Sequence, residues 1–352
     1  MSSKQQPAAE PDRYQKQRLF AGIGDAGQER LRAGRVLICG CGALGSVIAE
    51  TLVRAGVGFV RIVDRDFVEL SNLQRQVLFD ERDVVERLPK AVAAAEKLRE
   101  INSLVEVEPI IADIDFSNVR GFVEDVDLIL DGTDNFEVRF LINDAALETG
   151  TPWIYAGCIG SHGQVMAIFP GVTGCLRCLM GSVPDPGTME TCDTAGVLGP
   201  AINVVASLEA VAALKILTGQ RELVEPVLLA VDVWDGTLRA INVENLRDQS
   251  SCPACHQGER AWLSGDRGST TTVLCGRNAV QVSPRQLARI CLPDLAQRLR
   301  DTGAVNHNQY LLRLQLSDPD FDVTVFKDGR AIISGTEDLG VARGVYSRYI
   351  GL

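Results

Sequence analysis

Four of the ten cysteines form two Cys-x-x-Cys pairs, Cys175/Cys178 and Cys252/Cys255. Four thiolates suit a closed, tetrahedral, structural Zn²⁺. The second pair begins 74 positions after the first one ends (252 minus 178), which exceeds the spacing of ordinary zinc ribbons. A redox function is the alternative, but two matching pairs are then hard to explain. We expect a zinc site that ties the start of a long loop to the end of a large domain.

A fifth cysteine, Cys192, lies between Met189 and Gly196, just before a long apolar segment. Loops suit mobile nucleophiles, so one interpretation makes Cys192 a sulfur-transfer thiol. An inert loop thiol is the other interpretation, and the residues leave both open. The remaining cysteines are expected to pack. No histidine is predicted as a catalytic base, because the three are scattered along the chain: His162, His256 and His307.

The run Gly40–Gly45 has the spacing G-x-G-x-x-G between a predicted strand and a predicted helix. Gly40, Gly42 and Gly45 allow a tight turn that brings backbone N–H groups close to phosphate oxygens. Asp64 ends the next strand, 22 positions after Gly42, where a carboxylate accepts hydrogen bonds from ribose hydroxyls. The pattern predicts an adenine nucleotide but does not separate ATP from NAD. A tight turn without a nucleotide is the plain alternative.

The segment after Asp64 favours ATP over NAD. A dehydrogenase has no use for Ser-Asn-Leu-Gln-Arg-Gln at positions 71–76, whereas an enzyme acting on the α-phosphate of ATP needs cations and hydrogen-bond donors around the triphosphate. The amide of Asn72 and the planar fork of Arg75 are expected to reach the phosphates. We predict nucleotide contacts from four residues of this segment: Asp66, Asn72, Arg75 and Gln76.

Two further positions complete the predicted site. Lys90 follows a proline at the start of a predicted helix, so its ammonium group is expected to point back towards the phosphates. Asp134 and Asn135 come just after the strand Val126–Leu130, at the edge where such sheets bind ligands. We predict that Asp134 binds Mg²⁺ and that Asn135 contacts the nucleotide. Each residue alone would be an ordinary surface or turn residue, and their order after the phosphate loop carries the prediction.

Apolar periodicity places these residues on a Rossmann-like α/β fold. A strand at Arg35–Cys39, a helix at Ser46–Arg54 and a strand at Phe59–Val63 open a doubly wound, mostly parallel sheet. The stretch Gly171–Gly199 is long for a connection and is predicted to be a functional, zinc-bearing crossover. The further predicted strands are Val105–Ile111, Val126–Leu130, Trp153–Gly157, Gln164–Phe169, Val227–Val233 and Leu238–Val243. The further predicted helices are Pro89–Ile101, Arg139–Thr149 and Ala201–Leu217.

Composition shifts divide the chain into four predicted parts. These are an N-terminal arm (1–33), a nucleotide-binding domain (34–256), a linker (257–272) and a small α+β domain (273–352). In the last part we predict strands at Val273–Val282 and Tyr310–Leu316, a hairpin at Phe321–Ser334, and helices at Pro284–Arg300 and Thr336–Tyr349.

The net charge of −11 argues against a nucleic-acid partner, which normally needs a basic surface. No basic-then-apolar signal segment opens the chain, so we expect a cytoplasmic protein. The longest apolar run, Val197–Leu217, is interrupted by Glu209 and Lys215. It therefore predicts a buried helix, and no membrane partner is expected.

Taken together, these motifs resemble the ThiF/MoeB/HesA family, prokaryotic relatives of ubiquitin-activating enzymes. The resemblance covers roughly Arg13 to Cys255 and rests on Gly40–Gly45, Asp64–Gln76, Pro89-Lys90, Thr133–Asn135, Cys192–Pro200 and both cysteine pairs. It implies a homodimer that uses ATP and Mg²⁺ to adenylate the C-terminal glycine carboxylate of a small ubiquitin-like sulfur carrier, resembling ThiS or MoaD and ending in Gly-Gly. Thiamine-thiazole and molybdopterin formation are the two implied pathways.

The resemblance also implies individual roles. Asp64 would hold the ribose, Asn72, Arg75 and Lys90 would serve the phosphates, and Asp134 would hold the magnesium. Family members usually have Arg-Tyr-x-Arg-Gln near the N-terminus, with the second arginine crossing to the partner's ATP site. This chain has Lys16 at that position, which keeps the charge but loses the planar fork.

Some relatives carry a C-terminal rhodanese domain with a persulfide cysteine. The tail of this chain is not predicted to be one. A cysteine desulfurase or sulfurtransferase is a further expected partner. Two other classes of function stay open as alternatives. One is an NAD-dependent oxidoreductase, supported by the phosphate loop and Asp64; the other is a non-catalytic partner-binding module.

Overall fold

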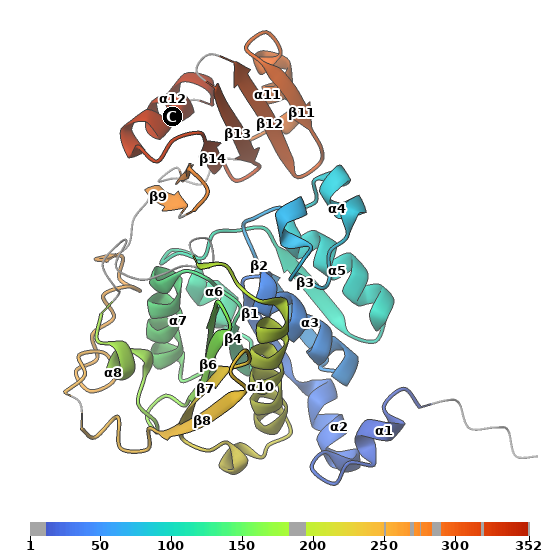
Figure 1. Ribbon diagram of the computed structural model, residues 1–352, viewed down its shortest axis with the longest axis vertical. Coiled ribbons are helices and arrows are strands. Elements are labelled where there is room, and N and C mark those ends of the chain that lie inside the picture. Colours follow the sequence, from blue (N-terminus) through green and yellow to red (C-terminus); the bar gives the residue numbers. More distant parts are fainter. Residues whose placement is uncertain are drawn as a thin grey trace, which may run out of the picture.

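Two β-sheets dominate the computed structural model (Figure 1). An eight-stranded sheet forms the larger unit, and a six-stranded sheet forms a smaller unit at the C-terminal end of the chain. Cys192 lies outside the residues that the structure describes. Those residues are 12–182, 195–249, 251–267, 271–274, 276–283, 290–317 and 320–350.

The large sheet has the order β3-β2-β1-β4-β5-β6-β7-β8. Its strands are β1 (Arg35–Cys39), β2 (Phe59–Val63), β3 (Glu106–Ile110), β4 (Leu128–Asp131), β5 (Trp153–Ile159), β6 (His162–Ile168), β7 (Val227–Asp232) and β8 (Thr237–Asn242). The pairings from β3 to β5 are parallel and those from β5 to β8 are antiparallel. The chain runs from β1 outward to β3 and then returns to the other side of β1. The crevice between β1 and β4 is therefore a topological switch point, where open α/β sheets bind ligands. The predicted Rossmann-like, mostly parallel sheet is confirmed.

Strand β1 explains why helices cover both faces of this sheet. Val36 and Ile38 join one apolar core and Leu37 and Cys39 join another, and all four side chains are fully buried. An interior parallel strand needs this cover on both sides. The first core includes residues of α3 (Ala43–Ala55), α5 (Lys90–Ile101) and α10 (Gly199–Leu217). The second includes residues of α6 (Val119–Val123), α7 (Phe136–Thr149) and α8 (Leu176–Met180).

Helix α10 is long and apolar enough to cross a membrane, as judged by length and composition alone. In the structure it packs against α3, β5 and β6, with Glu209 fully buried. Its apolar character therefore has an explanation in the core of this fold, as the interrupted apolar run predicts.

The C-terminal unit, β9 to α12, is an antiparallel sheet of order β11-β12-β13-β14-β10-β9 with helices on one face. Its helices α11 and α12 share one apolar core with residues of β10, β12, β13 and β14. This is the predicted small α+β arrangement. The elements are β9 (Thr271–Leu274), β10 (Ala279–Val282), α11 (Leu292–Leu299), β11 (Ala304–His307), β12 (Leu311–Ser317), β13 (Asp320–Phe326), β14 (Ala331–Ser334) and α12 (Leu339–Tyr349).

The prediction of one continuous strand over Val273–Val282 is wrong. The structure has an antiparallel hairpin, with β9 and β10 joined by a turn at residues 276–278. Gly276 and Asn278 have φ angles of 75° and 43°, which strands do not accommodate. Arg277 is therefore at the tip of a tight hairpin and not within a strand.

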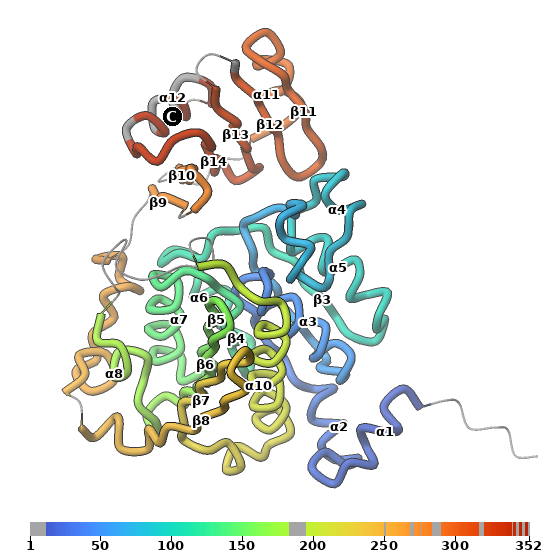
Figure 2. Tube along the Cα trace, in the orientation of Figure 1, coloured from blue at the N-terminus to red at the C-terminus, as the bar shows by residue number. Residues whose placement is uncertain are grey.

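Figure 2 follows the course of the chain through both units. The segment Ala261–Leu263, inside the predicted linker, is buried, and the Trp262 amide donates to Asp144 of α7 at 3.0 Å. The remaining elements are α1 (Gln15–Arg18), α2 (Gly24–Ala33), η1 (Leu70–Asn72), α4 (Glu81–Glu86) and η2 (Arg221–Leu223).

Candidate nucleotide site

The glycine-rich loop lies between β1 and α3, beside the end of β4. A Cβ atom on Gly40 would lie 2.8 Å from the carbonyl oxygen of Gly132, and one on Gly45 would lie 2.0 Å from that of Gly40. These two glycines are therefore required by backbone packing. Gly42 differs, because a Cβ there would meet nothing closer than 3.9 Å. The space over Gly42, at the N-terminus of α3, is open to a ligand, and that helix end favours an anion.

Asp64 follows the end of β2 and is bound to the glycine-rich loop. Its Oδ2 accepts a hydrogen bond from the Cys41 amide at 2.6 Å, and its Oδ1 accepts one from the Asp66 amide at 2.7 Å. Burial raises the pKa of Asp64, although the nearby Lys90 ammonium opposes the shift. Asp64 thus fixes the loop to β2 at the place where the sequence predicts the ribose.

Lys90 begins α5 and points back towards the segment after β2, as its position predicts. Its Nζ donates to Oδ2 of Asp66 at 3.0 Å, and only 3% of the residue is exposed. Burial disfavours the ammonium, but the Asp66 and Asp64 carboxylates outweigh it and hold the pKa of Lys90 above its usual value. Burial also acts against the Asp66 carboxylate, yet its cationic neighbours hold its pKa well below the usual range. The two groups form a buried ion pair.

Asn72 and Gln76 are buried, and Arg75 is half-buried. The Oδ1 of Asn72 accepts from the Glu69 amide at 3.1 Å, so part of this side chain holds its own turn. Gln76 gives stronger evidence of a ligand site than Asn72 does. Its Nε2 lies 4.0 Å from the Cβ position of Gly42, and its buried Oε1 has no hydrogen-bond partner among the described residues. Buried polar atoms are normally paired, so this oxygen calls for a hydrogen-bond donor, such as a water or a hydroxyl group.

Asp134 and Asn135 occupy the turn between β4 and α7. Asp134 is exposed. Asn135 caps α7, because its Oδ1 accepts from the amides of Glu137 at 2.8 Å and Val138 at 3.4 Å. The structure therefore gives Asn135 a cap function that the sequence analysis did not foresee.

A buried polar network forms hydrogen bonds to this turn and to the end of β4. Arg139 donates to Oδ2 of Asp131 at 2.9 Å and to the carbonyl of Thr133 at 2.6 Å. The Oε1 of Glu209 accepts from the Asp131 amide at 3.0 Å. This network was not predicted from the sequence. The available signal was Glu209, a carboxylate within an apolar helical run, which needs a buried partner.

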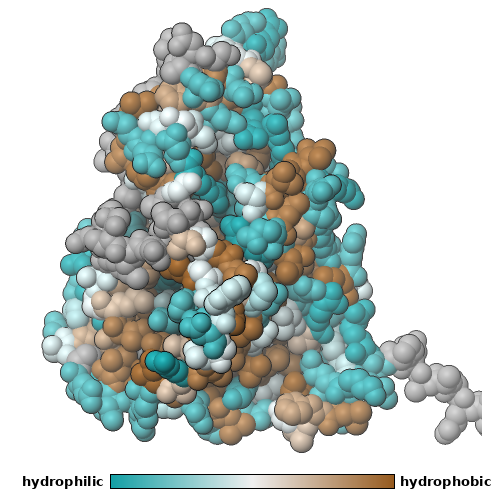
Figure 3. Space-filling model, in the orientation of Figure 1, coloured by the Kyte–Doolittle hydropathy of each residue, from teal (hydrophilic) through white to brown (hydrophobic). Residues whose placement is uncertain are grey.

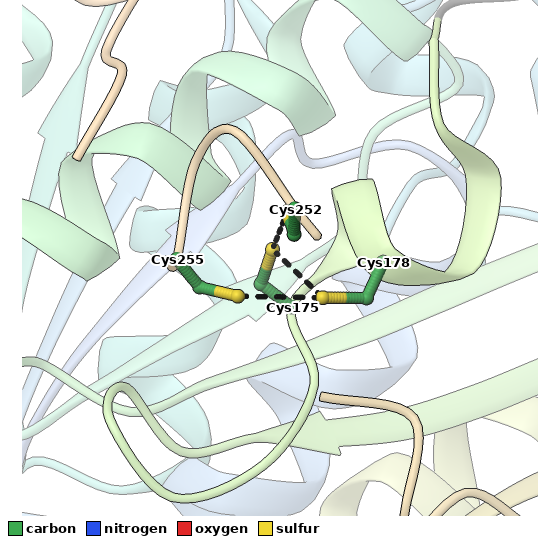
Figure 4. A group of neighbouring side chains, drawn as sticks. All are labelled: Cys175, Cys178, Cys252 and Cys255. Atoms are coloured by element: carbon green, nitrogen blue, oxygen red, sulfur yellow. Dashed lines mark hydrogen bonds between the residues drawn. The ribbon is translucent and has the colours of Figure 1, made fainter. Parts of the chain in front are cut away.

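The four cysteines predicted as zinc ligands meet at one point (Figure 4). Their sulfur atoms all lie within 4.8 Å of one another. The Sγ–Sγ distances are 3.8 Å for Cys175–Cys178, 3.6 Å for Cys175–Cys252 and 3.4 Å for Cys178–Cys255. The hydrogen bond to Cys178, together with burial, raises the pKa of Cys175 well above its ordinary value. Thiolates in this crowded cluster therefore require a cation.

The structure does not bring Lys16 to the glycine-rich loop of its own chain. Lys16 is exposed on α1, and its neighbour Tyr14 packs on Gly56 at the C-terminal end of α3. The thirteen residues of α3 span about 20 Å, and the loop lies at the opposite end of that helix.

Comparison with known proteins identifies the family of the chain. The ThiF family model matches residues 14–254. The sulfur carrier protein ThiS adenylyltransferase of Bacillus subtilis (strain 168) is 44% identical over 96% of this chain and 99% of its own length. The sulfur carrier protein adenylyltransferase of Thermus thermophilus is 40% identical over 70% of this chain and 91% of its own length.

Among solved structures, MccB, the microcin C7 biosynthetic enzyme of E. coli, matches with a TM-score of 0.61 and 24% identity. The match covers 71% of this chain and 77% of MccB, and it supports the fold alone. None of these three proteins is named as an oxidoreductase, so the oxidoreductase alternative receives no support. By its sequence match over most of its length and by the order of its motifs, the chain belongs to the ThiF family.

Proposed function

We propose that this protein is an adenylyltransferase that uses ATP to activate the C-terminal glycine carboxylate of a ubiquitin-like sulfur carrier. The observation that carries the proposal is the 44% identity to the ThiS adenylyltransferase of B. subtilis, which extends over 96% of this chain and 99% of that one. The open space over Gly42 and the Nε2 donor of Gln76, 4.0 Å from the Cβ position of Gly42, support it, because they lie where a nucleotide phosphate is expected.

The chemistry is divided among several groups of this chain. The α3 N-terminus and the amides of the glycine-rich loop bind phosphate, and Asp64 accepts from the ribose. Asn72, Arg75 and Lys90 stabilise the charge that builds on the phosphates as pyrophosphate leaves. The carrier carboxylate is already an anion at neutral pH, so it attacks the α-phosphorus without a general base. This agrees with a described site that contains carboxylates and cations but no histidine.

The reaction is tested by ATP–pyrophosphate exchange with a Gly-Gly-ended carrier from the same organism. We expect exchange that requires ATP, Mg²⁺ and the carrier together. Arg75→Ala should reduce the exchange rate by about a hundredfold, the order found when one donor to a developing charge is removed. Full exchange by Arg75→Ala, or none by the wild type with any such carrier, would remove the proposal.

Mg²⁺ is the second part of the proposal. The Asp134 carboxylate is exposed on the turn after β4, two residues after Gly132, whose carbonyl oxygen lies 3.9 Å from the Cβ position of Gly42, and an oxygen ligand of this kind suits Mg²⁺. Bound there, the ion would neutralise charge on the triphosphate. Asp134→Asn should raise the Mg²⁺ concentration needed for half-maximal exchange. An unchanged Mg²⁺ dependence would assign the ion to other ligands.

We also propose structural Zn²⁺ at the four cysteines. Zn–S bonds of about 2.3 Å in a tetrahedron separate the sulfurs by about 3.8 Å. The observed separations of 3.4 Å to 3.8 Å fit that geometry. Cys255→Ala should lower the bound zinc from one atom per chain to none, measured by elemental analysis. Cys291→Ala is the matched control, because that cysteine, wrongly predicted to pack, is exposed and outside the cluster. Equal zinc in both variants would contradict the assignment.

A homodimer is supported by an apolar surface on the antiparallel side of the large sheet. Trp234, Leu238 and Ile241 of the β7–β8 ribbon are 79%, 60% and 49% exposed, and Val211 of α10 is 51% exposed. Figure 3 shows hydrophobic residues gathered on the lower part of this face. A dimer would cover them. Leu238→Glu should shift the mass measured by light scattering from two chains towards one, and an unchanged mass would exclude this surface from the interface.

Of the two pathways, we propose thiamine-thiazole formation, since the B. subtilis relative, matched over 99% of its length, is named for ThiS. Cys192 is a candidate for the sulfur step that follows adenylation, with a cysteine desulfurase or sulfurtransferase as the sulfur source. In a reconstituted sulfur-transfer assay, Cys192→Ala should lose transfer but keep pyrophosphate exchange. Full transfer by this variant would leave Cys192 without a covalent function.

A further inference from the structure

The C-terminal unit packs against the large sheet beside the nucleotide site, above it in Figure 1. Phe67 and Ile111, from the segments after β2 and β3, pack against an apolar patch of that unit. The patch belongs to the sheet face opposite its helices. It consists of Leu274, Ala279, Leu311, Phe326 and Ile332. The contact therefore places the β9–β10 turn next to Asp66 and Lys90.

Arg277, in that turn, reaches into the buried ion pair. Its Nη1 lies 3.5 Å from Oδ2 of Asp66, the same oxygen to which the Lys90 ammonium donates at 3.0 Å. The Asp66 side chain is 17% exposed and that of Arg277 is 29% exposed. One carboxylate oxygen thus has two cations, one from the nucleotide-binding sheet and one from the C-terminal unit.

The arrangement raises a question of charge balance. The Lys90 ammonium has three N–H donors and gives one to Asp66, so it can also bind a phosphate, but a shift towards the phosphate weakens its ion pair with Asp66. A buried carboxylate that loses its cation is strongly destabilised. Arg65 is the other cation near Asp66, at 3.8 Å, but its closer partner is Asp113 at 3.0 Å. Arg277 is the cation placed to stay with Asp66 when Lys90 turns to the triphosphate.

We propose that Arg277 is a positioning residue of the ATP site, which neutralises Asp66 and so frees Lys90 to bind the phosphates. The C-terminal unit is then part of the nucleotide site, and its docking sets the affinity for ATP. This inference rests on the proposed adenylyltransferase function and adds to it a residue that lies outside the family match, which ends at residue 254.

A second polar contact crosses the same interface and ends at Asp113. The Nε2 of Gln281, on β10, donates to Asp113, which in turn pairs with Arg65. The guanidinium of Arg65 also lies 3.8 Å from Oδ1 of Asp66. Gln281 therefore holds the carboxylate that pairs with Arg65, while Arg277 contacts Asp66 directly.

The alternative is that Arg277 only stabilises the contact between the two units. A second arginine of the chain provides a matched control variant. Arg313 is on β12, in the same unit and interface, and its guanidinium stacks 5.5 Å from the ring centroid of Phe67. It also pairs with Asp322 of its own unit at 2.7 Å. Arg313→Gln removes an interface cation by the same substitution as Arg277→Gln but leaves the described contacts of Asp66 in place.

The experiment measures the dissociation constant of ATP with Mg²⁺ by calorimetry on the full chain, without carrier. Arg277→Gln should raise it about tenfold, the order expected when a partly buried charge pair is lost, and Arg277→Lys should restore most of the affinity. Arg313→Gln should change it by less than about twofold. In an Asp66→Asn background the charge is gone, so adding Arg277→Gln should have little further effect.

The outcomes separate this inference from the proposed function. If the wild type binds ATP and supports exchange while Arg277→Gln binds ATP equally well, the inference fails and the function stands. Equal losses for Arg277→Gln and Arg313→Gln, or additive effects of Asp66→Asn and Arg277→Gln, would reduce Arg277 to an interface contact. A wild type that binds no ATP would remove the proposed function itself.

Discussion

Replacing Glu209 by glutamine should stabilise the folded protein by an amount that grows with pH. Glu209 is fully buried on α10, and its Oε1 accepts from the Asp131 amide. Its Oε2 has no partner among the described residues. Burial, followed by the neighbouring Asp131 carboxylate, raises the pKa of Glu209 well above its ordinary value of 4.5. The folded protein therefore holds this side chain as the neutral acid, which glutamine imitates in shape and charge.

The sign of the effect follows from proton binding. Below pH 4.5 the folded and unfolded chains both carry the proton, so Glu209 adds no pH dependence. Above it the unfolded chain loses the proton while the folded chain keeps it, and stability falls as pH rises. The cost is about 1.4 kcal/mol for each pH unit over which the two states differ. Glutamine has no proton to lose, so the variant escapes this cost.

Urea unfolding followed by tryptophan fluorescence measures the difference. The three tryptophans are Trp153, Trp234 and Trp262, all before β9, so the signal reports the large unit. The free energy of unfolding of Glu209→Gln minus that of the wild type should rise by about 1.4 kcal/mol per pH unit from about pH 5 upwards. The exposed Glu100→Gln on α5 is the control and should show no such slope. A constant difference from pH 5 to pH 8 would refute a neutral buried Glu209.

The remaining predictions concern the glycine-rich loop and the α7 cap. Gly42→Ala should weaken ATP binding at least about tenfold while changing the free energy of unfolding by under about 1 kcal/mol, since the new methyl meets no protein atom within 3.9 Å. Gly40→Ala should destabilise the fold by about 3 kcal/mol or more, because φ is 89° and the methyl would meet the Gly132 carbonyl. Equal stability of the Gly42→Ala and Gly40→Ala variants, measured by urea unfolding, would contradict the different functions given to these two glycines. Asn135→Ala should cost about 1 kcal/mol of stability, whereas Asn135→Asp, which keeps the capping oxygen, should retain both stability and ATP affinity. Loss of ATP binding by Asn135→Asp at full stability would instead make its amide a nucleotide ligand.

The sequence predicted those parts of the site that depend on local order. Gly40 to Gly45, Asp64 and Lys90 each lie next to the end of a strand or the start of a helix. Once the strands are parallel, their places at one edge of the sheet follow. The four cysteines could be grouped for a different reason. Tetrahedral thiolate chemistry requires four ligands, even though the 74 positions between the pairs gave no local signal.

The parts that the sequence analysis missed depend on contacts between distant segments. No pattern near Glu209 in the sequence indicates its hydrogen bond to Asp131, which lies 78 positions away. The ion pair of Arg277 with Asp66 joins residues 211 positions apart and exists only because the C-terminal unit docks beside β2. The split of Val273–Val282 into two strands depended on a turn whose apolar flanks resemble one strand. Asn135 was assigned to the nucleotide because an asparagine after a strand suits a ligand and a helix cap equally.

The central claim is that this chain transfers AMP to the C-terminal carboxylate of a sulfur carrier. Intact-mass spectrometry of the carrier tests it most directly, after incubation with the full chain, ATP and Mg²⁺ and with pyrophosphate removed by pyrophosphatase. We predict a carrier heavier by one adenylyl group, absent when the terminal glycine is deleted and formed about a hundredfold more slowly with Arg75→Ala. A carrier of unchanged mass in the presence of bound ATP, or one modified equally well without its terminal glycine, would contradict it.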